Sequence, residues 1–67
     1  MAMHTKTKTY RTGWSTLFVK ESCWYLVTVR AASGALHDKV RCDDYRTALE
    51  YWKAFNSIAK NGGVTYG

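Results

Sequence analysis

The chain has 67 residues with a formal net charge of +5, and 46% of the residues are hydrophobic. This hydrophobic content argues against intrinsic disorder, and no apolar run reaches the roughly 18 residues that a transmembrane helix needs. A chain this short forms one small domain that buries only about 60% of its unfolded surface, so we expect modest stability.

The positive charge is concentrated at the start of the chain. Residues 1–20 include four basic residues and no acidic one, whereas three bases balance three acids in residues 43–67. Such a localised positive field is typical of proteins that bind nucleic acid or another acidic surface. The N-terminus has no apolar segment of the secretory type, so we expect a cytoplasmic protein in which Cys23 and Cys42 are reduced thiols buried in the core.

Residues 1–12 allow two interpretations. Threonine alternates with lysine from Thr5 towards Arg11, which fits an edge strand that lysines protect against edge-to-edge aggregation. The same residues fit a flexible basic arm, because chain termini are often mobile unless they pair with another strand. Both interpretations remain open at the level of sequence.

Two strands are predicted next, over residues 14–20 and 23–31, with Glu21 and Ser22 in the turn between them. The second segment is nearly all β-branched, aromatic or aliphatic, so we expect it to be the central strand. Alternation gives this strand a core face with Cys23, Tyr25, Val27, Val29 and Ala31. Its other face, which meets water or a partner, carries Trp24, Leu26, Thr28 and Arg30.

A tight hairpin follows, with Ser33 and Gly34 as the two central residues and 35–42 as the returning strand. The predicted cross-strand pairs are Arg30 with His37, Thr28 with Lys39, Leu26 with Arg41, Val27 with Val40 and Tyr25 with Cys42, which leaves Asp38 facing inward. A three-residue loop would shift this register by one and reverse the faces of the returning strand. The polar alternation of that strand favours the two-residue loop.

From Asp43 the apolar period changes from two residues to about 3.6, which predicts an amphipathic helix. Its apolar stripe consists of Ala48, Trp52, Phe55 and Ala59, flanked by Leu49, Tyr51 and Ile58. Asp43 or Asp44 can cap this helix, and the segment 47–50 matches a capping box if the helix begins one turn later. Asn61, Gly62 and Gly63 predict its end.

We therefore expect an α+β fold: a three-stranded antiparallel sheet, or a four-stranded one if residues 1–12 form the edge strand, with one C-terminal helix on one face. Residues 13–62 form a single β-β-β-α domain in this interpretation. Residues 1–12 are the arm or edge strand, and residues 63–67 are a tail.

The sequence favours neither a metal site nor catalysis. Cys23, His37 and Cys42 lack the paired short spacings of a zinc site. A cysteine nucleophile needs a nearby base, and His37 is predicted on the opposite face from Cys42. Asp43 and Asp44 are explained by helix capping. We expect no enzyme activity, no cofactor and no metal.

The remaining candidate is a basic and aromatic sheet face, which together with the N-terminal arm could bind nucleic acid. The predicted binding residues are Lys6, Lys8, Arg11, Trp24, Thr28, Arg30, His37, Lys39 and Arg41. Two other interpretations are a merely solvated sheet face and an apolar patch of Trp24, Leu26 and Leu17 that binds a protein partner or a second copy of the chain.

Residues 14–61 resemble the arm-type DNA-binding domain of phage integrases and the related plant Apetala-type domain. The resemblance rests on Trp24-Tyr25, the Ser33-Gly34 hairpin, the basic returning strand and the segment Asp44–Trp52. In that family a three-stranded sheet reads the major groove and a C-terminal helix packs behind it. The resemblance implies a duplex-DNA-binding protein of a phage or mobile element, acting in the host cytoplasm. No recombinase domain follows residue 61, so we expect a stand-alone binder.

Small phage and plasmid proteins with this strand and helix content also act as inhibitors of host enzymes. The alternative function is therefore an interaction protein that binds an acidic surface of a larger host protein, such as a polymerase or a defence complex. The two functions differ in their dependence on salt, because phosphate contacts release counterions and apolar contacts do not.

Overall fold

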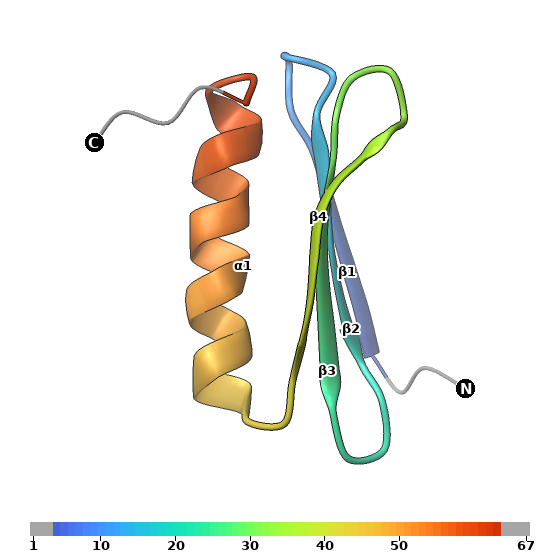
Figure 1. Ribbon diagram of the computed structural model, residues 1–67, viewed down its shortest axis with the longest axis vertical. Helices are drawn as coiled ribbons and strands as arrows, with labels where there is room; N and C mark the ends of the chain where they lie inside the picture. Colours follow the sequence, from blue (N-terminus) through green and yellow to red (C-terminus); the bar gives the residue numbers. More distant parts are fainter. Residues whose placement is uncertain (1–3, 64–67) are drawn as a thin grey trace.

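The computed structural model describes residues 4–63 as a four-stranded antiparallel sheet with one helix packed on one of its faces (Figure 1). The strands are β1 (His4–Thr9), β2 (Ser15–Lys20), β3 (Tyr25–Arg30) and β4 (Leu36–Cys42), and they lie across the sheet in chain order. The helix α1 (Tyr45–Lys60) follows β4. The predicted α+β fold is confirmed.

The N-terminal segment contains an edge strand, which is one of its two predicted forms. β1 pairs antiparallel with β2, with Lys6 opposite Phe18 and Thr7 opposite Leu17. Successive residues of a strand face opposite sides, so β1 turns its threonines to one side of the sheet and its lysines to the other. Residues 1–3 of the predicted arm and 64–67 of the predicted tail lie outside the described residues.

The hairpin between β3 and β4 has a three-residue loop, so the predicted two-residue loop is wrong. The amide of Ala31 donates to the carbonyl of Ala35 at 2.9 Å, and the amide of Gly34 donates to the carbonyl of Ala31 at 2.9 Å. Ala32 and Ser33 are therefore the central turn residues. Gly34 follows with φ of +91°, a left-handed conformation that glycine adopts without strain.

A β-bulge then restores the predicted register. Arg30 lies opposite Leu36, but Val29 lies opposite Asp38, which makes His37 the extra residue of β4. The predicted pair of Arg30 with His37 is therefore wrong. The other four predicted pairs are confirmed: Thr28 with Lys39, Leu26 with Arg41, Val27 with Val40 and Tyr25 with Cys42. The extra residue in the loop and the extra residue in the bulge offset one another, so the faces of β4 beyond the bulge are as predicted.

The core lies between α1 and the sheet face that the helix covers. The buried hydrophobic residues are Phe18, Val27, Val29, Cys42, Ala48, Phe55 and Ala59. The predicted helix stripe is confirmed for Ala48, Phe55 and Ala59, whereas Trp52 is only partly buried. The prediction that Cys23 is a core residue is wrong, because it is exposed in the turn that the amide of Glu21 and the carbonyl of Trp24 close at 2.9 Å.

Asp44 caps the start of α1. Its carboxylate accepts hydrogen bonds from the amide and the hydroxyl of Thr47, both at 2.9 Å. The helix thus begins at Tyr45, and the later start with a capping box is wrong. These hydrogen bonds, the amide's first, lower the pKa of Asp44. The stabilisation is present above the unfolded pKa near 3.9 and is lost as pH falls through the lower folded value.

Asn56 links α1 to the sheet through polar contacts between the helix and the sheet face that it covers. Its Oδ1 accepts hydrogen bonds from the hydroxyls of Tyr10 at 2.8 Å and Thr16 at 2.6 Å. Its Nδ2 donates to the carbonyl of Trp52 at 2.9 Å. Thr16 is only 2% exposed, so its hydroxyl depends on this acceptor.

Replacing Asn56 with leucine should destabilise the fold by about 1 to 3 kcal/mol, because the buried hydroxyl of Thr16 then has no acceptor. The free energy of unfolding in urea measures this loss. In the double variant Asn56→Leu, Thr16→Val both partners are apolar, and part of the loss should be recovered. A double variant that is less stable than Asn56→Leu alone would contradict this account.

Candidate nucleic-acid interface

The sheet face opposite α1 is covered by no other described element (Figure 1). The strand registers place on it a row of residues from each strand: Thr5, Thr7 and Thr9 of β1, Ser15, Leu17 and Val19 of β2, Leu26, Thr28 and Arg30 of β3, and Leu36, Lys39 and Arg41 of β4. We call these residues the open face. None of them is acidic.

Three cations occupy the side of the open face formed by β3 and β4. Arg30 donates from Nη1 to the carbonyl oxygen of Gly34 at 3.2 Å. The guanidinium carbon of Arg41 lies 4.7 Å from the ring centre of Trp24, which is a cation–π contact. Lys39 lies opposite Thr28, between the two arginines along the sheet. The two arginines are therefore held by the protein itself before any partner binds.

The centre of the open face is aliphatic. Leu17, Val19 and Leu26, which we call the aliphatic strip, are each half-buried. Val19 lies directly opposite Leu26. Next to them, on β1, lie Thr5, Thr7 and Thr9, which we call the threonine row. Across the strands the open face therefore changes from hydroxyl groups through the aliphatic strip to positive charge.

The structure brings five of the nine predicted binding residues to the open side: Trp24, Thr28, Arg30, Lys39 and Arg41. Thr28 is only 4% exposed there. Lys6 and Lys8 face the helix side, where their ammonium groups lie 6.0 Å from the ring centre of Phe18 and 5.8 Å from that of Tyr10. Arg11 lies in the turn between β1 and β2. The N-terminal lysines and the open face are thus not one surface.

His37 does not lie with the other predicted binding residues of β3 and β4, and the bulge explains why. Its ring centre lies 4.9 Å from that of Trp14 in an edge contact, and Trp14 packs against the core. A bulge lets neighbouring residues of one strand face the same side. His37 therefore lies with Trp14, away from Lys39 and Arg41.

The sequence predicted Leu17 of β2 beside Leu26 in an apolar patch, but it did not predict that the threonines of β1 and Ser15 of β2 lie on the open face. The threonine row could have been found from the alternation of threonine with lysine, since that pattern separates two chemically different faces in a strand. Ser15 carried no such signal. Its place beside Arg30 depends on the pairing of β2 with β3.

The two cysteines lie in different environments, and neither belongs to a metal site formed by the described residues. Within residues 4–63 no three His, Cys, Asp or Glu side chains gather as metal ligands. Burial raises the pKa of the Cys42 thiol, and the carboxylates of Asp43 and Asp44 raise it further. At neutral pH this thiol is protonated, which makes it a poor nucleophile.

Cys42→Ser should cost about 1 to 3 kcal/mol of stability, because a hydroxyl replaces a buried thiol without a hydrogen-bond partner. Cys23→Ser is the matched control, and its effect should stay within about 0.5 kcal/mol because Cys23 is exposed. A chromogenic thiol reagent should accordingly modify Cys23 in the native protein and Cys42 only after unfolding. Equal reaction rates of the two thiols in native protein would contradict the burial of Cys42.

The stability that protonated Cys42 contributes should also depend on pH. It is present below the unfolded thiol pKa near 8.5 and is lost as pH rises through the higher folded value. The stability difference between wild type and Cys42→Ala should therefore shrink in alkaline solution.

Comparisons of the chain with protein-family models, with curated proteins and with solved structures found no match. No helix among the described residues is long and apolar enough to cross a membrane. The open face, with its clustered cations and its uncovered position, is the feature from which a function can be inferred.

Proposed function

We propose that this protein binds nucleic acid, with duplex DNA as the preferred form, through the open face. The observation that carries the proposal is the clustering of Arg30, Lys39 and Arg41 on a sheet face that α1 leaves uncovered and that has no acidic strand residue. Arginine and lysine neutralise backbone phosphates and release their counterions. A major groove about 12 Å wide admits two strands, and β3 and β4, at one edge of the sheet, carry all three cations.

The three cations are suited to different contacts. A guanidinium has a planar set of donors that can bind two acceptors of a guanine edge or two phosphate oxygens, whereas an ammonium acts as a point charge. Arg41 is held over Trp24 at 4.7 Å, so less side-chain freedom is lost when it binds. We assign phosphate contact to Lys39 and either phosphate or base contact to the two arginines.

The resemblance to the arm-type domain of phage integrases supports the same proposal, since that family also uses a sheet backed by a helix. β1 extends this sheet beyond the three strands of that family. The resemblance further suggests a binding protein without enzyme activity that acts in a host cytoplasm.

The aliphatic strip supports a second candidate function, the inhibition of a larger host protein. Leu17, Val19 and Leu26 present half-buried apolar surface at the centre of the open face, and a protein interface also combines an apolar centre with a charged rim. A partner for this surface would carry an acidic rim opposite Arg30, Lys39 and Arg41.

A binding titration with short labelled duplex DNA and single-stranded RNA, at about 50 and 200 mM salt, tests the proposal. Three phosphate contacts give a slope of log K against log salt of roughly −2.7 for duplex DNA, because each contributes about −0.9. A protein partner held by the aliphatic strip would show much weaker salt dependence. Absence of binding to both nucleic acids at the lower salt concentration would overturn the proposal.

A further inference from the structure

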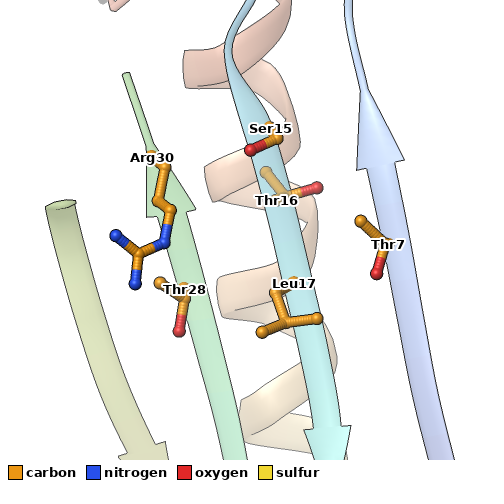
Figure 2. Close-up of a pocket in the computed structure, with 6 residues that line it drawn as sticks. All are labelled: Thr7, Ser15, Thr16, Leu17, Thr28 and Arg30. Atoms are coloured by element: carbon orange, nitrogen blue, oxygen red, sulfur yellow. The ribbon is translucent and has the colours of Figure 1, made fainter. Parts of the chain in front are cut away.

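A hollow of about 180 Å³ opens on the open face between β1, β2 and β3 (Figure 2). Its lining residues are Thr7, Ser15, Thr16, Leu17, Thr28 and Arg30. One water molecule occupies roughly 30 Å³ in the liquid, so the hollow has room for a group of several heavy atoms. Hydroxyl groups and one guanidinium supply its polar lining.

Thr28 is the strongest indication that the hollow has a polar occupant. The side chain is only 4% exposed, yet its hydroxyl forms no hydrogen bond with another described residue. No buried side-chain oxygen among the described residues is sealed without a partner, so this hydroxyl remains open to the hollow. Water in the free protein, or a ligand that replaces this water, therefore supplies its hydrogen-bond partner.

Two further hydroxyls lie at the edge of the hollow. Those of Thr7 and Ser15 also form no hydrogen bond within the described part of the chain. Thr16 differs, because its hydroxyl donates to Asn56 on the helix side of the sheet at 2.6 Å. Leu17 lies opposite Thr7 on one side and Thr28 on the other, so it separates these two hydroxyls, whereas Ser15 lies opposite Arg30. Among the described residues, Ser15 and Thr28 are therefore the hydroxyls without a partner that lie on the Arg30 side of the hollow, and Thr7 lies at its far side.

Arg30 adds positive charge to this group. Figure 2 shows its side chain extending along β3, with the guanidinium beside Thr28. One of its nitrogens donates to Gly34 at 3.2 Å, and a guanidinium has five N–H donors. No acidic residue lines the hollow.

We propose that the hollow is a phosphate-binding site, in which the hydroxyls of Ser15 and Thr28 and the guanidinium of Arg30 donate to phosphate oxygens. Donors from several directions suit a tetrahedral oxyanion, and charge-assisted hydrogen bonds are the stronger ones. The assignment of this phosphate to a nucleic-acid backbone rests on the proposed function. In that case the hollow fixes the register of the sheet on the strand, since phosphate contacts position a protein and base contacts specify sequence.

An NMR titration of the full chain with inorganic phosphate tests the site itself, and a titration with a short DNA duplex tests the source of the phosphate. The amide signals of Ser15 and Thr28 should shift with both ligands. Thr28→Val and Arg30→Gln should each weaken phosphate binding at least about tenfold, because each removes a hydrogen bond to a charged group.

Matched controls separate the site from general effects. Thr5→Val changes a threonine of the same row outside the lining, and Lys53→Gln removes one positive charge from an exposed position on α1. Both should bind phosphate like wild type. Ser15→Ala, at the partly exposed edge of the hollow, repeats the test if Thr28→Val perturbs the fold.

The outcomes distinguish the site from the proposed function. Phosphate shifts at the hollow without any binding of DNA would support a site for small phosphorylated molecules and overturn the nucleic-acid proposal. DNA binding that Thr28→Val and Ser15→Ala leave unchanged, with no phosphate shifts at the hollow, would overturn the site and leave the proposed function standing.

Discussion

Replacing Phe55 with alanine should unfold most of the protein at room temperature. The Phe55 side chain is 3% exposed and belongs to the core that includes Val27 and Val29, both fully buried. Phenylalanine to alanine in a core costs about 3 to 5 kcal/mol, and a single core in so small a domain rarely supplies more than that. Thermal melting followed by circular dichroism measures the effect.

Tyr51→Ala is the matched control, because it removes an aromatic ring one turn earlier on the same helix. Tyr51 is 41% exposed, and its ring centre lies 5.9 Å from that of Phe55. Its loss should cost at most about 1.5 kcal/mol, the upper value for an aromatic pair. Wild-type melting of Phe55→Ala would mean that this face of α1 does not form the core.

The helix could be predicted well because its signals are local. A period of 3.6 residues identified Ala48, Phe55 and Ala59, which are buried as expected. The cap was found among two neighbouring aspartates, and only the structure shows that it is Asp44. Such patterns depend on residues within one or two turns, so a single sequence contains them.

The hairpin between β3 and β4 could be predicted only in part. Ala32, Ser33 and Gly34 form a three-residue loop with glycine in the left-handed position, a loop that sequence could have suggested. The bulge at His37 had no comparable local signal. The predicted faces were right only because the loop and the bulge each added one residue.

Contacts between distant segments were beyond the sequence. Thr16 is buried although it is polar, because Asn56, 40 positions later, accepts its hydrogen bond. Alternation correctly placed Thr28 on the face opposite the core, but its neighbours on β2 and β4 leave it only 4% exposed. The hollow beside Thr28 needs residues from three strands and could not be derived from any one of them.

The three cations of the candidate interface could be predicted because all lie on one hairpin. The N-terminal lysines could not be placed, since their face depends on how β1 pairs with β2. That pairing puts Lys6 opposite Phe18 on the helix side. The open face therefore carries fewer positive charges than the sequence predicted, and it carries more hydroxyl groups.

The triple variant Arg30→Ala, Lys39→Ala, Arg41→Ala should lose nucleic-acid binding while keeping its fold. All three residues are exposed, and exposed substitutions usually change stability by about 0.5 kcal/mol or less each. The salt slope should become less steep by roughly 2.7, and the affinity at low salt should fall at least about a hundredfold. Fluorescence anisotropy with labelled duplex DNA measures both quantities, and circular dichroism checks the fold.

A second triple variant, with alanine at Arg46, Lys53 and Lys60, makes the same change of charge on α1. Each variant lowers the net charge from +5 to +2, a loss of three. A difference in DNA affinity between the two variants therefore depends on where the charges lie. The helix variant should bind DNA nearly as wild type does. Equal losses in the two variants would mean that net charge alone attracts DNA.

Trp24→Ala then separates the two candidate functions. Apolar anchors dominate protein interfaces, so an inhibitor of a host protein should lose most of its affinity when Trp24 is truncated. A phosphate-dominated interface should lose more when Arg30, Lys39 and Arg41 are removed, and Trp24→Ala should act mainly by freeing Arg41. If the variant without Arg30, Lys39 and Arg41 binds DNA as tightly as wild type, the nucleic-acid proposal is overturned. The aliphatic strip of Leu17, Val19 and Leu26 would then be the surface on which to seek a protein partner.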